Sequence, residues 1–164
     1  EVIPGKSVVG IEIPNEDRAN RMIDHLNNPD TFGIENPFPT LAADDPDFSE
    51  EGEGCRGSVV PAFTFMIIKG LEKYARYEMA RECSIRHLYY MLDTLHPEGK
   101  QKGDIYEAYA PRRDGPAKWT GNPDYPRKLY LAYAALSAVT LMIENIIGLY
   151  TGHEILECLI HPRC

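Results

Sequence analysis

Residues 129–143 form the longest stretch of the chain without a charged side chain, and nearly all of it is apolar. A bilayer-spanning helix needs about 17 to 25 apolar residues, and Ser137 and Thr140 dilute this shorter stretch further. A helix that is apolar on all its faces is stable when other helices surround it. The stretch therefore predicts a buried helix in a helical protein, and no membrane partner.

Apolar residues at helical spacing predict three more helices. The four cover about residues 16–28, 61–74, 77–95 and 125–149. Asn15 can cap the first helix, and Pro61 suits the first position of the second. The second and third form a helical hairpin, so the expected fold class is all-α.

Two long loops, residues 29–57 and 99–127, separate these helices and are rich in Gly and Pro. A loop of that length inside a compact domain is either functional or disordered. The aromatic residues Phe32, Phe38 and Phe48 favour a first loop that packs onto the protein. We therefore expect the chemistry on one rim of the helices. Residues 1–15 alternate like an extended segment, and residues 150–164 fit a short helix or a strand.

Composition excludes several classes of partner and cofactor. The chain has 25 acidic and 17 basic residues and a net charge of −8, so it lacks the positive charge that binds nucleic acid. Residues 3–15 are similar to a stretch of bacterial septal DNA translocases, and Gly5-Lys6-Ser7 to part of a P-loop. The first glycine of a P-loop would precede residue 1, and residues 8–13 read as extended where a P-loop has a helix. Residues 158–164 read C-x2-H-x2-C without an obvious fourth ligand. We expect no nucleic acid, metal or cofactor. No signal peptide is visible, and the compartment is not predicted.

Glu107 is the strongest candidate for catalysis. It follows a glycine-containing turn and lies between Tyr106 and Tyr109. Aromatic neighbours bury part of a carboxylate, and their hydroxyl groups can hold it, which tunes a carboxylate for acid or base work. The alternative is an ordinary surface glutamate near a loop.

Three further residues are candidates for substrate binding. Arg56, in a Cys-Arg-Gly turn, can bind hydroxyl or carboxylate groups, or else pair with the surrounding acids. Asp45, paired with Asp44, can bind sugar hydroxyls or a metal, or else cap a helix or a turn. Trp119, the single tryptophan, can stack on a sugar, or else anchor its loop in the core. The turn at residues 54–61 and the segment at residues 103–111 together predict one concave, sugar-like site.

The order of these motifs resembles the C-terminal half of the catalytic domain of (α/α)6-barrel glycoside hydrolases, over about residues 18–149. The nearest groups are glycoside hydrolase family 63, the mannosylglycerate hydrolase-like domain and the trehalases. The segments that carry the resemblance are HLNNPDTF (25–32), PTLAADDPDF (39–48), CRGSVVP (55–61), YEAYAP (106–111) and LMIENIIGL (141–149). It implies a partial domain over residues 1–164, with a toroid-like region at 16–149 and flanks at 1–15 and 150–164.

The resemblance also implies an inverting hydrolase that acts on an oligosaccharide or small glycoside. Glu107 falls at the general base of the family, with Arg56, Tyr106, Tyr109, Asp45 and Trp119 around the sugar. No aspartate of this chain matches the family's acid, and Cys55 and Val60 stand where the family has tryptophans that line the sugar site. We expect the chain alone to be inactive and to need the missing half-barrel or another protomer. The alternative is a non-catalytic helical module that binds a sugar or another chain.

Overall fold

The computed structural model describes residues 14–93, 104–112, 115–129, 131–151 and 156–158. Its helices are α1 (Glu16–Asn27), α2 (Pro61–Lys73), α3 (Tyr77–Asp93) and a continuous helical stretch made of η1 (Leu131–Ala135), α4 (Leu136–Leu141) and η2 (Met142–Ile147). Strands β1 (Leu149–Thr151) and β2 (Leu156–Cys158) form an antiparallel pair. The described chain is thus a helical body with one small hairpin, which confirms the all-α class and is consistent with part of a helical toroid.

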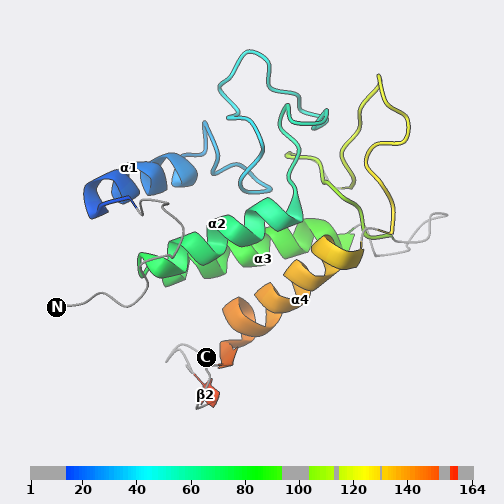
Figure 1. The fold of residues 1–164 in the computed structure, drawn as a ribbon. Coiled ribbons are helices and arrows are strands. Elements are labelled where there is room, and N and C mark those ends of the chain that lie inside the picture. Colours follow the sequence, from blue (N-terminus) through cyan, green and yellow to red (C-terminus); the bar gives the residue numbers. More distant parts are fainter. Residues whose placement is uncertain (1–13, 94–103, 113–114, 130, 152–155, 159–164) are drawn as a thin grey trace.

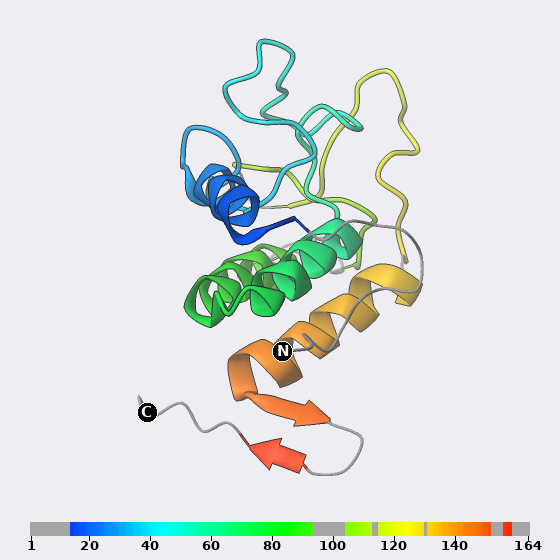
Figure 2. The ribbon, with the colours of Figure 1, turned by 60° about the vertical axis from the view of Figure 1, so that its left-hand side comes forward.

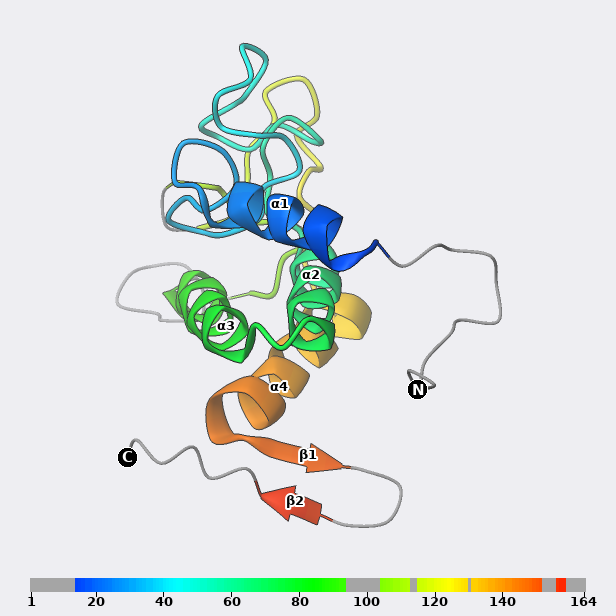
Figure 3. The ribbon, with the colours of Figure 1, turned by 90° about the vertical axis from the view of Figure 1, so that its left-hand side faces the viewer.

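The helices form a stack with the loops at one end. Figure 3 shows α2 and α3 side by side, with α1 on one side of the pair and α4 on the other. The long loops gather beyond the N-terminal end of α2 (Figures 1 and 2). The prediction that the unusual residues share one rim of the helices matches this arrangement.

Local signals set the bounds of the first three helices. The side chain of Asn15 accepts a hydrogen bond from the backbone N–H of Arg18 at 3.0 Å, which satisfies a free amide in the first turn. Pro61 begins α2, where its missing N–H costs nothing. Ala75, with a left-handed φ of 56°, makes the turn into α3. The predicted cap, start and hairpin are all confirmed.

The last helix begins later than the predicted residue 125. Residues 125–129 are irregular because Glu107 holds them: its N–H donates to the carbonyl of Arg127 at 3.0 Å, and its carboxylate accepts from the N–H of Arg127 at 3.2 Å. Leu129 has a left-handed φ of 53°, so the helix starts only at Leu131. It ends before Gly148, whose φ of 83° suits glycine. Residues 150–164, for which the sequence fitted either a short helix or a strand, contain β2 and most of β1.

The expectation that this helix is buried on all sides is wrong. Ala134, Ser137 and Leu141 face the core, whereas Tyr133 and Leu136 are 62% and 66% exposed. None of the helices in the described residues combines the length and apolarity that a bilayer crossing requires. The predicted extended segment up to residue 13, including Gly5-Lys6-Ser7, and two residues of the C-x2-H-x2-C motif lie outside the described residues.

A buried polar pair ties the first loop to α3 and to the second loop. Asn36 is fully buried; its Nδ2 donates to the carbonyl of Ala110 at 3.0 Å, and its N–H donates to the carbonyl of Pro111 at 3.1 Å. Its Oδ1 lies 3.1 Å from Nδ1 of the buried His87. Because Asn36 Oδ1 can only accept, His87 carries its proton on Nδ1. The other ring nitrogen, Nε2, has no partner among the described residues.

Burial lowers the pKa of His87 from 6.5 to about 4. We therefore expect the folded protein to lose stability as the pH is lowered from above 6.5 towards 4. The unfolded chain binds the proton first, and unfolding should therefore become easier by about 2 kcal/mol between pH 7.5 and pH 5. Urea unfolding at the two pH values measures the change. His87→Gln should remove this part of the pH dependence, and His25→Gln, at an exposed residue of α1, should leave it. An equal pH dependence in the wild type and His87→Gln would contradict the prediction.

Candidate functional site

The two loop segments that the sequence singled out lie together in the structure. Val59 and Tyr109 pair in an antiparallel bridge, with two N–H···O hydrogen bonds of 2.9 Å. Gly57 makes the turn before Val59; its φ is 113°, and a Cβ there would lie 2.7 Å from the ring of Phe48. The turn thus requires glycine, and the bridge places it beside the segment that carries Glu107.

Glu107 is held by Arg127. Nε of Arg127 donates to Glu107 Oε2 at 2.7 Å, and Nη2 donates to Oε1 at 3.1 Å. The backbone N–H of Arg127 also donates to Oε2. The Glu107 side chain is 23% exposed and that of Arg127 is 64% exposed. This two-pronged pair fixes the carboxylate between the Tyr106–Tyr109 segment and the chain that leads into the last helix.

The pair favours the ionised form of Glu107. The hydrogen bond from the Arg127 side chain is the main cause that lowers the pKa of Glu107, against partial burial, which raises it. Oε2 accepts two hydrogen bonds and Oε1 accepts one, so Oε1 keeps capacity to accept from a water. The carboxylate is therefore in the form that a base needs, although Arg127 weakens its basicity.

Tyr125 connects Glu107 with the Arg-Gly turn. Burial raises the pKa of Tyr125, and Glu107 and Cys55 add smaller contributions, whereas its interaction with the Ser58 side chain lowers this pKa. The ring of Trp119 meets that of Tyr125 edge to face, with centroids 5.8 Å apart. The rings of Trp119 and Tyr125 thus lie together, and the charge of Glu107 acts on the phenol of Tyr125. Aromatic, hydroxyl and carboxylate groups are of the kinds that suit a sugar.

Trp119 lies against the same turn. It is 42% exposed, and a Cβ on Gly54 would lie 3.4 Å from its ring. One part of the ring thus packs on the loop rather than in the core, another part is open, and sugar stacking by Trp119 stays a prediction.

Tyr106 and Tyr109 differ in position. Tyr109 is fully buried, edge to face with the rings of Tyr106 and His87 at 6.3 and 6.4 Å. Its phenol oxygen accepts from the N–H of Tyr106 at 3.2 Å. Tyr106 is half-buried. Tyr109 has no exposed surface that a sugar could contact in this structure. It packs in the core under the segment that carries Glu107, so the predicted direct contact with substrate is not possible in this arrangement.

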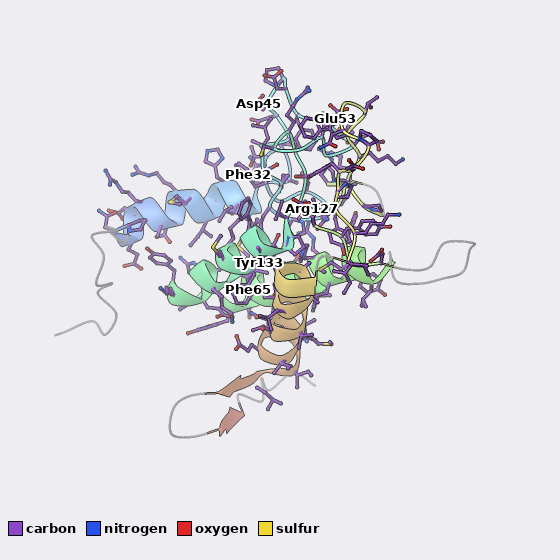
Figure 4. All side chains as sticks on the ribbon, turned by 45° about the vertical axis from the view of Figure 1, so that its right-hand side comes forward. Phe32, Asp45, Glu53, Phe65, Arg127 and Tyr133 are labelled. Atoms are coloured by element: carbon purple, nitrogen blue, oxygen red, sulfur yellow. The ribbon has the colours of Figure 1, made fainter. Side chains whose placement is uncertain are left out.

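Arg56 and Asp45 make the contacts that were considered as alternatives to sugar binding, namely pairing with nearby acids for Arg56 and capping of a turn for Asp45. Arg56 donates through Nε to the carbonyl of Asp47 at 3.0 Å and lies 3.4 Å from a carboxylate oxygen of Glu53. Asp45 caps its own turn, since its Oδ1 accepts from the N–H of Asp47 at 2.9 Å. Figure 4 places Asp45 and Glu53 high in the loops and Arg127 nearer the helices. Sugar binding by Arg56 and Asp45 stays a prediction.

Sequence reasoning missed three residues of the site, namely Arg127, Tyr125 and Ser58. Arg127 was placed inside a helix that begins after it. The signal that could have found the irregular segment is its proline content, with Pro123 and Pro126 three residues apart. Nothing local assigns Arg127 to Glu107, which lies twenty residues earlier. In the part of the chain that the structure describes, no three His, Cys, Asp or Glu residues group as metal ligands.

Comparison with known proteins gives two matches. The sequence model of the mannosylglycerate hydrolase MGH1-like glycoside hydrolase domain matches residues 8–126. An uncharacterized protein of Borreliella burgdorferi is 51% identical over 150 residues, which cover 88% of this chain and 32% of that protein. The chain therefore spans about a third of the length of this relative.

Proposed function

Because the chain belongs to the mannosylglycerate hydrolase MGH1-like glycoside hydrolase domain family, we propose that it acts in the inverting hydrolysis of a glycosidic bond, with Glu107 as the general base. The observation that supports this most is the position of Glu107, which Arg127 holds through both carboxylate oxygens in the segment that pairs with Val59 after the Arg-Gly turn. The substrate class is an oligosaccharide or a small glycoside.

The proposed step uses the open side of the carboxylate. Oε1 of Glu107 takes a proton from a water, and the water oxygen attacks the anomeric carbon as the bond to the leaving oxygen breaks. An acid on the opposite side of the sugar gives its proton to that oxygen. In inverting enzymes the two carboxyl groups stand about 6.5 to 9.5 Å apart, which leaves room for the water.

No aspartate of this chain matches the general acid of the family. In this proposal a residue from outside this chain therefore supplies the general acid. Trp119 and Tyr106 contribute aromatic surface to the sugar. Arg56 already donates to Asp47 and Glu53, and Asp45 accepts from Asp47, so hydroxyl groups of a sugar would add to these contacts or compete with them.

A second candidate is a non-catalytic helical module that binds a sugar or another chain. Two observations favour it. Cys55 and Val60 replace the tryptophans that the resemblance implies, and Arg127 engages both oxygens of Glu107. Such a module would bind saccharides without turning them over.

The single tryptophan gives a direct binding assay. Ligand at the proposed site should change the fluorescence of Trp119 because the ring is partly exposed beside Tyr125. We expect saturable changes in the isolated chain with a panel of glycosides that includes mannosylglycerate and trehalose, and no hydrolysis. The exposed Tyr89→Phe variant is the control for effects away from the site, and it should give the wild-type curve.

Turnover separates the two candidates. The chain coexpressed with the rest of the Borreliella relative should release a product whose first-formed anomer, seen by NMR, has the inverted configuration. Binding without turnover in that preparation would favour the module. Retention of configuration, or no binding at all, would overturn the proposed hydrolysis.

A further inference from the structure

Thr64 is an exception among the hydroxyl-bearing residues of the described helices. Ser84, Ser137 and Thr140 each donate to a carbonyl three or four residues earlier on their own helix, at 2.7 to 2.9 Å. This is the usual partner of a hydroxyl group inside a helix. Thr64 is fully buried in α2, yet its Oγ1 has no hydrogen-bond partner among the described residues. The Thr64 hydroxyl is therefore available to a group outside its own helix.

His87 of α3 carries the complementary atom. Its Nδ1 donates to Oδ1 of Asn36, and the amide nitrogen of Asn36 is fixed by its bond to the carbonyl of Ala110. Burial lowers the pKa of His87 to about 4, so at pH 7 the ring is neutral and Nε2 carries no proton. Nε2 can then only accept a hydrogen bond, and it too is buried without a partner in the described part of the chain.

Thr64 and His87 lie at the same level of two packed helices. Figure 3 shows α2 and α3 side by side, and Ala75 makes the turn between them. Thr64 precedes Ala75 by eleven residues and His87 follows it by twelve. At 1.5 Å of rise per residue, both residues are about 16 to 18 Å from the turn. Both side chains are buried, so two unpaired polar atoms belong to one layer of the hairpin interior.

We propose that one internal water molecule bridges Oγ1 of Thr64 and Nε2 of His87. The water accepts from the Thr64 hydroxyl and donates to Nε2. Internal waters typically make two to four hydrogen bonds to buried polar groups that lack other partners. A water also spans two polar atoms that are too far apart for a direct hydrogen bond.

The chemistry of the site favours water over a metal ion. A hydroxyl and a neutral imidazole bring no negative charge to it. Cys83 lies one helical turn before His87, but burial raises the pKa of the Cys83 thiol to about 11, so the thiol keeps its proton. A metal ion requires deprotonated ligands.

The bridge completes a buried chain of hydrogen bonds through four segments. It runs from Thr64 of α2 through the water to His87 of α3, then to Asn36 of the first loop and to the carbonyl of Ala110. Ala110 follows Glu107 by three residues. The chain thus ties the helical hairpin to the segment that carries Glu107. The proposal does not rest on hydrolysis by Glu107.

Thr64→Val tests the bridge because valine keeps the shape of threonine and removes the hydroxyl. Loss of a bridged hydroxyl leaves buried polar atoms unsatisfied, so the equilibrium constant of unfolding, measured with urea, should rise about 5- to 30-fold. If the hydroxyl has no partner in solution, a methyl group in its place leaves stability unchanged or raises it. That result would overturn the proposal.

The same substitution in a His87→Phe background tests the partner. Phenylalanine lacks Nε2, so Thr64→Val should there change the unfolding constant less than twofold. Thr140→Val is the matched control, because the Thr140 hydroxyl donates within its own helix. Its effect should be equal in the two backgrounds, as for independent sites. An equal effect of Thr64→Val in both backgrounds would count against a link to His87.

NMR identifies the bridging group. Rotating-frame NOE spectra give opposite signs for direct contact with water and for proton exchange. We expect a contact signal between water and Hε1 of His87 in the wild type, and its loss in Thr64→Val. Energetic coupling of Thr64 with His87 without this signal would mean a direct hydrogen bond and would overturn the water site.

Discussion

Glu107→Gln is expected to reduce glycoside hydrolysis by a factor of about 10² to 10⁴, the usual contribution of a general base. The amide has nearly the same shape as the carboxylate but cannot take a proton from water. Binding, followed through Trp119, should persist. The measurement is the turnover rate of the chain coexpressed with the remainder of the Borreliella relative.

Glu53→Gln is the matched control for this variant. Glu53 also pairs with an arginine, and its side chain is 27% exposed against 23% for Glu107. Turnover should stay close to the wild-type rate. If Glu107→Gln is as active as Glu53→Gln, Glu107 is not the base.

Arg127→Gln distinguishes a base from a carboxylate that only supports the loop. The Arg127 side chain is the main cause that lowers the pKa of Glu107, so its removal should raise that pKa. A base works only when deprotonated, and activity is lost as pH falls through its pKa. The acid side of the pH–rate profile should therefore move to higher pH in this variant. If the acid side of the pH–rate profile does not move in Arg127→Gln, Glu107 is not the base, even if the rate itself is lower.

Tyr109→Ala should lower the free energy of unfolding by about 3 to 5 kcal/mol, as for other buried aromatic residues replaced by alanine. The ring is fully buried between His87 and Tyr106 and belongs to the main core cluster. Its loss leaves a cavity under the segment that carries Glu107. Urea unfolding monitored by circular dichroism at pH 7.5 gives the value.

Tyr109→Phe is the matched variant. It keeps the ring and removes the oxygen that accepts from the N–H of Tyr106, a hydrogen bond of about 1 kcal/mol. Saccharide binding by this variant should be close to wild type. A loss of binding without a loss of stability would restore Tyr109 as a direct ligand, and a small effect of Tyr109→Ala on stability would contradict its role in the core.

Several features could be predicted from the sequence because they depend on neighbouring residues. Asn15 next to an acidic first turn predicts the start of α1, and Pro61 predicts the start of α2. Caps and fixed backbone angles act over three or four residues, so they are visible in the chain itself. The two loops that carry the candidate residues were predicted in the same way, from their Gly and Pro content.

The candidate site could be predicted only in part. The two segments themselves predicted that the Arg-Gly turn and the Glu107 segment share one site, and the structure joins them through Val59 and Tyr109. The pairing of Glu107 with Arg127 did not follow, because it depends on how residues 125–129 return to the loop. Burial of Tyr109 was missed for a similar reason, since the sequence does not show which side of an irregular segment faces the core.

The sequence alone determined the helical class, the bounds of α1, α2 and α3, and the choice of Glu107, all from local preferences and ordered motifs. Only the tertiary structure decided where the last helix begins, which residue holds Glu107 and which face of the last helix is open. An apolar helix has the same sequence whether other helices cover one side or all sides. Its exposure depends on the elements that pack beside it, and those contacts join residues far apart in the chain.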